Sequence, residues 1–141
     1  MKLNHFTDFS MRVLMYLNHQ KAGKTTSLDE LASQFKISRN HIIKVVQFLS
    51  HNDYVITKRG KNGGIIISEN ARTKPIGDLI NSIEQDQSPI INCNDKPCVL
   101  AAHSCKLKYI FQLGYKSFLD TLNQFTLANL MFENWDEIFE E

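Results

Sequence analysis

The sequence predicts a mainly α-helical fold that contains one small β-hairpin. Apolar residues recur at spacings of three and four along much of the chain, which is the period of an amphipathic helix. Two short β-rich runs, at residues 54–57 and 65–68, flank a glycine-containing stretch and predict the hairpin. A long apolar stripe between residues 104 and 125 predicts an extended helix that needs a partner.

The first predicted helix covers residues 6–19. Its apolar positions share one face: Phe6, Phe9, Val13, Leu14 and Leu17. Thr7 is the expected cap, and Asp8 then lies in the first turn, where the helix dipole favours a carboxylate. The stretch KAGKTT breaks the pattern and ends the helix.

Two further helices are predicted on either side of a tight turn. The stretch SLDELASQF opens with Ser27 and has Glu30 three residues later, the signature of a capping box. After the turn KIS, Ser38 can cap the helix RNHIIKVVQFLSHN, whose apolar face holds Ile42, Val45, Val46 and Leu49. Two short helices joined in this way form a helix-turn-helix, although ordinary helical bundles contain the same pattern.

The predicted hairpin favours a helix-turn-helix over an ordinary helical bundle. The connection between its strands carries cations and glycines: Lys58, Arg59, Gly60, Lys61, Gly63 and Gly64. The glycines permit positive φ and close backbone approach. A hairpin directly after a helix-turn-helix is a wing, whose cations would lie beside a phosphate backbone or in a minor groove. The alternative is a solvated turn with incidental lysines.

Charge is divided unevenly along the chain. Residues 1–75 hold twelve Lys or Arg and five Asp or Glu, whereas residues 76–141 hold four and ten. A basic first half is typical of a protein with a polyanionic partner, and the alternative is an uneven solvated surface. We therefore expect residues 1–75 to form a winged helix-turn-helix DNA-binding domain.

The second half is predicted to contain a short helix, PIGDLINSIEQ, with Pro75 in its first turn, and a long helix from about Ser104 toward Phe125. The stripe of the long helix consists of Leu107, Phe111, Tyr115, Phe118, Leu122 and Phe125. Gly114 would allow a close crossing. A globular core could cover this stripe, but the chain offers few other helices, so we favour a symmetric dimer. The acidic end, TLANLMFENWDEIFEE, is expected to fray.

All three cysteines, Cys93, Cys98 and Cys105, lie in the window CNDKPCVLAAHSC. No signal peptide or membrane helix is predicted, so we expect a cytoplasmic protein, in which clustered thiols more often bind metal or sense redox than form disulfides. Three thiolates suit zinc or an iron–sulfur cluster. A 4Fe–4S cluster usually takes four thiolates, so the fourth ligand would be a residue other than cysteine, with Asp8 and His103 as candidates.

The spacing of the cysteines also predicts a bend. In one continuous helix the Cα atoms of Cys98 and Cys105 would lie about 10 Å apart, a long reach for one cluster. We therefore expect a turn between them, with Cys105 in the first turn of the long helix. There the helix N-terminus and Lys106 would stabilise thiolate charge.

Several pieces, taken in this order, resemble the bacterial winged-helix iron–sulfur repressor family that includes NsrR and IscR: ISRNHIIKVVQFL, KRGKNGGIIIS and the three cysteines followed by KLK. HFTDFSMRVLMYL and the stretch beginning CKLKYIFQLGY resemble the NsrR branch. Lys108 stands where the IscR type carries a histidine. The cysteine gaps of four and six depart from both branches, which more often have five in the second. Asn52 and Asp53 replace the usual glycine before the wing, and both tolerate left-handed backbone.

The resemblance implies a homodimeric transcriptional repressor of nitrosative-stress genes, and not an enzyme. The implied cofactor is a 4Fe–4S cluster, with 2Fe–2S as the alternative. It would be held by Cys93, Cys98 and Cys105 and, as the favoured fourth ligand, by Asp8 of the partner subunit. Attack of nitric oxide on the cluster would release the DNA. Residues 76–141 would then form a cluster-binding loop and dimerisation helices.

The residues expected to contact double-stranded DNA lie on the second helix of the helix-turn-helix and on the wing: Ser38, Arg39, Asn40, His41, Lys44, Lys58, Arg59, Lys61 and Asn62. Arginine can grip a guanine edge and asparagine an adenine edge, each with two hydrogen bonds. Two-fold symmetry predicts a palindromic operator with half-sites about one helical turn apart.

Three alternatives stay open at this point. The same DNA-binding fold could carry zinc or a thiol redox switch, or it could regulate iron–sulfur biogenesis as the IscR type does. A carrier of iron–sulfur clusters or a redox enzyme would lack sequence-specific DNA binding. The helix-turn-helix with its basic wing argues against this last class.

Overall fold

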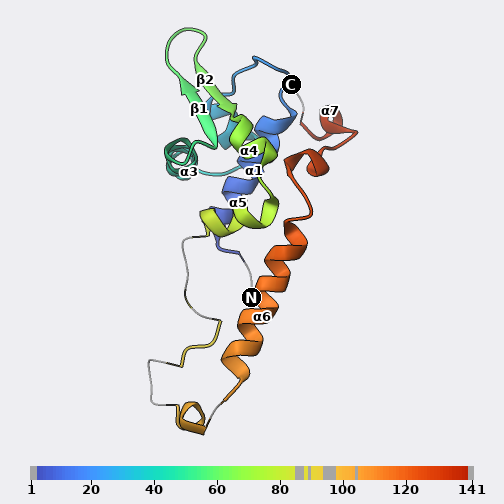
Figure 1. Cartoon of the computed structure of the whole chain (residues 1–141). Coiled ribbons are helices and arrows are strands. Elements are labelled where there is room, and N and C mark those ends of the chain that lie inside the picture. The colour runs from blue at the N-terminus through green and yellow to red at the C-terminus, as the bar shows by residue number, and fades with distance from the viewer. Residues whose placement is uncertain (1–2, 85–87, 89, 94–97, 104, 140–141) are drawn as a thin grey trace.

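The computed structural model describes residues 3–84, 88, 90–93, 98–103 and 105–139. It is mainly helical and has one two-stranded antiparallel hairpin, which confirms the predicted fold class (Figure 1). The elements in chain order are α1 (His5–His19), α2 (Leu28–Phe35), α3 (Arg39–His51), β1 (Val55–Lys58), β2 (Gly64–Ile67), α4 (Glu69–Thr73), α5 (Ile76–Ile83), η1 (Val99–His103), α6 (Leu107–Leu122), η2 (Leu127–Leu130) and α7 (Trp135–Ile138), where η marks a 3-10 helix.

Side-chain caps fix where the first helices begin. Ser27 and Ser38 cap α2 and α3, as predicted. The expected cap of α1 was wrong, because Asn4 accepts the backbone N–H of Thr7 at 2.8 Å and the helix begins at His5. Pro75 occupies the cap position of α5 and not its first turn, and the short helix α4 was not predicted.

The core lies where α1, α3, α5 and the hairpin meet. The predicted faces of α1 and α3 supply its buried centre: Val13, Leu14, Leu17, Ile42, Val45, Val46 and Leu49. Leu79 and Ile83 of α5 and Ile65 of β2 pack into the same cluster. Each such side chain contributes about 1.5–3 kcal/mol when it is buried, so these elements hold the helix-turn-helix and the hairpin in one unit.

The hairpin is tied to the helix-turn-helix at its base. β1 pairs with β2 so that Val55 lies opposite Ile67, and both strands are displaced by one residue from their predicted positions. Thr26, in the loop before α2, exchanges two backbone hydrogen bonds with Ile65, of 3.0 and 2.8 Å. Asp53 has a φ of 57°, which confirms that left-handed backbone precedes the wing.

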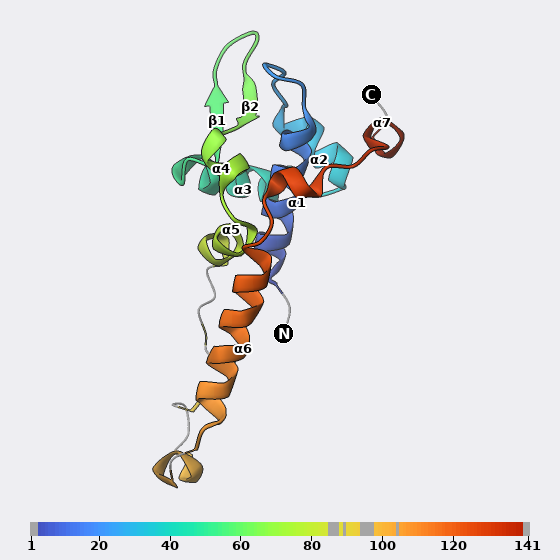
Figure 2. The same ribbon diagram turned by 45° about the vertical axis from the view of Figure 1, so that its right-hand side comes forward.

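Helix α6 projects away from the core, and only its C-terminal part packs on α5 (Figures 1 and 2). At this crossing a Cβ on Gly77 would meet the backbone carbonyl of Leu119 and the side chain of Asn123. Asn123 in turn accepts the backbone N–H of Asp78 at 2.8 Å. A Cβ on Gly114 would meet nothing within 4 Å, so within one chain the close crossing depends on Gly77 and not on Gly114.

The end of the chain folds back across α1 toward α2 (Figure 2). The prediction that it frays was wrong for residues 126–139, because Leu127 is fully buried and aromatic side chains anchor the rest. Trp135 stacks on His19 with 3.7 Å between ring centroids, and Phe139 lies 5.0 Å from Tyr16. We call Phe132, Trp135 and Phe139 the C-terminal clasp.

Candidate nucleic-acid interface and cysteine segment

Helix α3 carries an exposed polar face opposite its buried apolar face. Arg39, Asn40, His41 and Lys44 are all exposed at its surface. Asn40 and Lys44 lie one helical turn apart, so their side chains share a face. His41 has partners within the chain, since its Nδ1 lies 2.9 Å from the hydroxyl of Ser38. The structure thus places the residues expected to read bases together on the exposed face of the N-terminal half of α3.

The wing carries the other group of expected DNA contacts: Lys58, Arg59, Lys61 and Asn62. All four are exposed, at the end of the hairpin that extends beyond the helices (Figures 1 and 2). Within the described residues none of the three cations forms an ion pair. Their charge is therefore available to a phosphate backbone.

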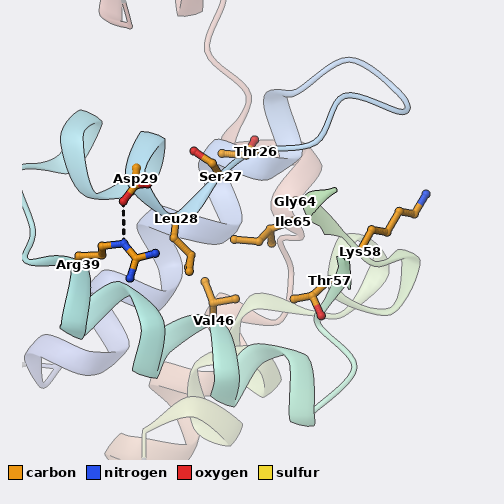
Figure 3. A pocket seen from close by; sticks show the side chains of 10 residues that line it. All are labelled: Thr26, Ser27, Leu28, Asp29, Arg39, Val46, Thr57, Lys58, Gly64 and Ile65. Carbon is orange, nitrogen blue, oxygen red and sulfur yellow. Dashed lines mark hydrogen bonds and ion pairs between the residues drawn. The ribbon is translucent and has the colours of Figure 1, made fainter. Parts of the chain in front are cut away.

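Arg39 differs from the wing cations because it already has an anionic partner. Its Nε donates to Oδ1 of Asp29, in the first turn of α2, at 2.7 Å (Figure 3). The bond joins the two helices of the helix-turn-helix at the edge of an open groove that reaches the wing. Sequence reasoning missed Asp29, because no local spacing relates a residue of one helix to a partner on the next.

The cysteines lie between α5 and α6, in the segment that leads to the projecting helix. All three are free thiols; Cys93 is partly buried, whereas Cys98 and Cys105 are exposed. The 3-10 helix η1 separates Cys98 from Cys105, which confirms that they do not share one continuous helix. The placement of Cys105 in the first turn was wrong: α6 begins at Leu107 and Lys106 occupies its cap position, so Cys105 precedes the helix. Ser104, the expected start, is outside the described residues.

The predicted metal ligands are not gathered in one place. Among the described residues, no group of three or more His, Cys, Asp or Glu side chains is arranged to hold a metal. Asp8 lies in the first turn of α1, where Arg12 donates to both its oxygens, at 3.0 and 2.9 Å. His103 is exposed at the end of η1. The donor chemistry still fits a soft metal, because three free thiols lie in one short segment.

Hydrogen bonds of Glu84 connect the start of the cysteine segment to the first turn of α1, which carries Asp8. The Glu84 carboxylate accepts hydrogen bonds from the backbone N–H and the side-chain amide of Asn4, and from the hydroxyl of Thr7 at 2.8 Å. Thr7 is fully buried, so this contact is part of the folded body. The sequence gives no signal for a pair so far apart along the chain.

Fold and surface together define a winged-helix transcriptional regulator with a cysteine-bearing segment before its last long helix. The chain belongs to the Rrf2 family: residues 3–133 match this family, which is described as an iron-dependent transcriptional regulator. Its members are regulators and not enzymes; they bind DNA and are typically dimeric. In the described part of the chain, no helix has the length and apolar character needed to span a bilayer.

Solved structures of regulators share this fold. The chain is similar to CymR (YrzC), the global cysteine regulator of B. subtilis, with 20% identity, a TM-score of 0.70 and coverage of 92% of this chain and 95% of that one. The oxidized form of Staphylococcus aureus CymR gives the same values. IscR of T. potens is 17% identical, with a TM-score of 0.70 and coverage of 100% and 93%. At these identities the likeness shows the fold alone.

Proposed function

We propose that the chain is a homodimeric transcriptional repressor whose cysteine segment holds an iron–sulfur cluster that senses nitric oxide. The observation that carries the proposal is the confinement of all three free thiols to the segment between the DNA-binding unit and α6. A change in this segment would act directly on the connection between the DNA-binding unit and α6. The resemblance of the sequence to the NsrR branch favours nitric oxide as the signal.

Helix α6 supports a dimer. Among the described residues, its N-terminal half carries large apolar side chains that stay 38–61% exposed: Leu107, Tyr109, Ile110, Phe111 and Leu113. A contiguous apolar surface of this kind marks an interaction site. A second copy would cover it with the same surface, in a symmetric contact. The two recognition helices would then face a palindromic operator.

Cys93, Cys98 and Cys105 would hold the cluster, with Asp8 of the partner subunit as the favoured fourth ligand and His103 as the alternative. When bound, the cluster supplies an iron whose non-thiolate ligand nitric oxide can displace. Asp8 is now paired with Arg12, in an exposed pair four residues apart. Such a pair contributes about 0.3–0.5 kcal/mol, so a ligand bond can readily replace it.

Each DNA contact in the proposal uses a side chain that the fold leaves exposed. Asn40 and Lys44 would enter the major groove with α3, together with Arg39. The wing cations would meet the backbone or the minor groove.

A second candidate is a thiol sensor without a cluster. Two observations favour it: Cys98 and Cys105 are exposed thiols, and the described residues contain no gathered metal site. The fold likeness to CymR, named as a cysteine regulator and solved in an oxidized form, points the same way. An exposed thiol can be oxidised and reduced reversibly, so it can act as a switch. Zinc at the same thiols, or regulation of the IscR type, are further variants.

The deciding experiment combines colour with DNA binding. Protein purified without oxygen should be brown, should retard DNA and should release it when nitric oxide is added. Replacement of any one cysteine by alanine should remove the colour. Asp8→Ala should speed bleaching, whereas Asp120→Ala should not, because Asp120 also forms an ion pair four residues from its partner but lies on α6.

A colourless protein would contradict the cluster. If its DNA binding is then abolished by peroxide and restored by dithiothreitol, the thiol sensor is correct. Bound zinc, found by metal analysis, would identify the zinc variant. Brown protein whose DNA binding is unaffected by nitric oxide would support the cluster but contradict nitric oxide as its signal.

A further inference from the structure

Arg39 is anchored before any DNA is present. It is the first residue of α3, directly after the cap Ser38, and its Nε donates to Oδ1 of Asp29 at 2.7 Å. Both side chains are largely exposed, 55% for Arg39 and 78% for Asp29. Exposed pairs of this type contribute little to folding stability. The contact therefore does more to fix the direction of Arg39 than to hold α2 and α3 together, which the buried core already does.

The anchor determines which edge of the guanidinium is free. Arginine has five N–H donors in a planar fork, and Asp29 occupies the one on Nε. The two terminal nitrogens point away from the carboxylate (Figure 3). Arginine can grip the O6 and N7 atoms of guanine with two donors at once. With Nε taken, the grip must use both terminal nitrogens, which requires one particular approach to the base.

The anchor also lowers the entropy lost on binding. A free arginine side chain samples many rotamers, and ordering it at an interface costs free energy. A side chain that a carboxylate already holds has lost part of that freedom. In addition, the negative charge of Asp29 repels phosphates that come near it, so it disfavours contact of Arg39 with the DNA backbone.

We propose that Asp29 is a positioning residue for base readout: it holds Arg39 so that the end of its guanidinium meets a guanine. The proposal rests on the proposed contact of Arg39 with DNA and adds a residue that makes this contact selective. Loss of Asp29 frees Arg39 to bind any phosphate. The result is a loss of preference for one base in each half-site, together with stronger binding to unrelated DNA.

The test uses selection from a randomised duplex library with full-length protein purified without oxygen. Wild type should enrich a palindrome with a guanine preference at one position of each half-site. Arg39→Ala should lose the preference at this position only. Asp29→Ala should reduce it there by about two- to fivefold, and Asp29→Asn, which keeps the acceptor without the charge, should retain part of it. Asp120→Ala removes an equal charge on α6 and should change nothing.

The outcomes distinguish failure of sequence-specific DNA binding from failure of the positioning role of Asp29. A library from which wild type enriches no sequence would contradict sequence-specific DNA binding itself. Enrichment by wild type that Asp29→Ala leaves unchanged, or changes at a different position from Arg39→Ala, would overturn the role of Asp29 alone. A lower melting temperature of Asp29→Ala with intact base preference would show that the pair only ties α2 to α3. The double variant should equal Arg39→Ala, because Asp29 acts through Arg39.

Discussion

Gly77 is the residue on which the junction between the DNA-binding unit and α6 depends. The backbone of α6 passes so close to it that a methyl group would overlap the carbonyl of Leu119. The side chain of Asn123 fills the remaining space and bonds both the backbone N–H and the carboxylate of Asp78, at 2.8 and 3.0 Å. Any displacement of the C-terminal part of α6 would therefore press on α5 through this tight backbone contact.

Gly77→Ala should lower the free energy of unfolding by about 1–3 kcal/mol, because the added methyl has to displace the backbone of α6. Gly114→Ala, compared in the Ile110→Glu background so that a dimer contact does not contribute, is the matched control, since it is also a glycine in a helix but has open space around it within one chain. It should gain roughly 0.5–1 kcal/mol from helix propensity. Urea denaturation followed by circular dichroism measures both. An equal loss in the two variants would contradict the role assigned to Gly77.

At the scale of elements, local signals predicted most of the DNA-binding unit. Ser27 and Ser38 each cap a helix at the expected position, because a cap depends on only three or four neighbouring residues. The hairpin was predicted within one residue for the same reason. Contacts between elements were not predicted. Asp29 with Arg39 and Glu84 with Thr7 join residues whose proximity only the tertiary fold creates.

The C-terminal clasp was missed because composition was misleading. The segment is acidic, and acidic ends are often solvated. However, Trp135 and Phe139 are four residues apart, so they lie on one side of the last helical turn and both reach Tyr16. His19 completes the contact: its Nε2 accepts the backbone N–H of Phe132 at 2.7 Å, while its Nδ1 donates to the carbonyl of Met15.

Trp135→Ala should destabilise the DNA-binding unit by about 1–3 kcal/mol, since it removes an aromatic ring that packs on the core. Ile138→Ala is the control, because Ile138 lies in the same short helix but is 46% exposed. It should change stability by less than about 0.5 kcal/mol. Thermal unfolding followed by circular dichroism gives both values. Identical melting temperatures for Trp135→Ala and wild type would contradict a structural role for the clasp.

At the scale of the whole molecule, α6 separates the cysteine end of the chain from the DNA-binding end. A helix of 16 residues is about 24 Å long, and its N-terminal half extends beyond α5 (Figure 2), with its large apolar side chains exposed among the described residues. The sequence predicted the apolar stripe of this helix but could not predict which part the chain itself covers. The stripe from Leu107 to Phe125 is continuous in sequence, whereas α5 covers only its later part.

Ile110→Glu should convert the dimer into a monomer, because it places a charge in the apolar surface that the second copy would bury. Ile110 is 58% exposed within one chain, so the fold of the monomer should be unaffected. Ile56→Glu is the control: Ile56 is 48% exposed on β1, away from α6. Sedimentation velocity measures the mass of each variant. A dimer that persists in Ile110→Glu would place the interface elsewhere.

The position of Leu127 in the core has a consequence for how the protein is made. All other buried members of this core lie at or before Ile83, and Leu127 joins them only after the cysteine segment and α6. A chain emerging from the ribosome therefore leaves a gap in its apolar core until η2 has been synthesised. Contacts so distant along the chain form slowly, because loop closure must precede them. Synthesis that stalls within the cysteine segment should thus yield a nascent chain whose core exposes the apolar surface that Leu127 covers in the complete fold.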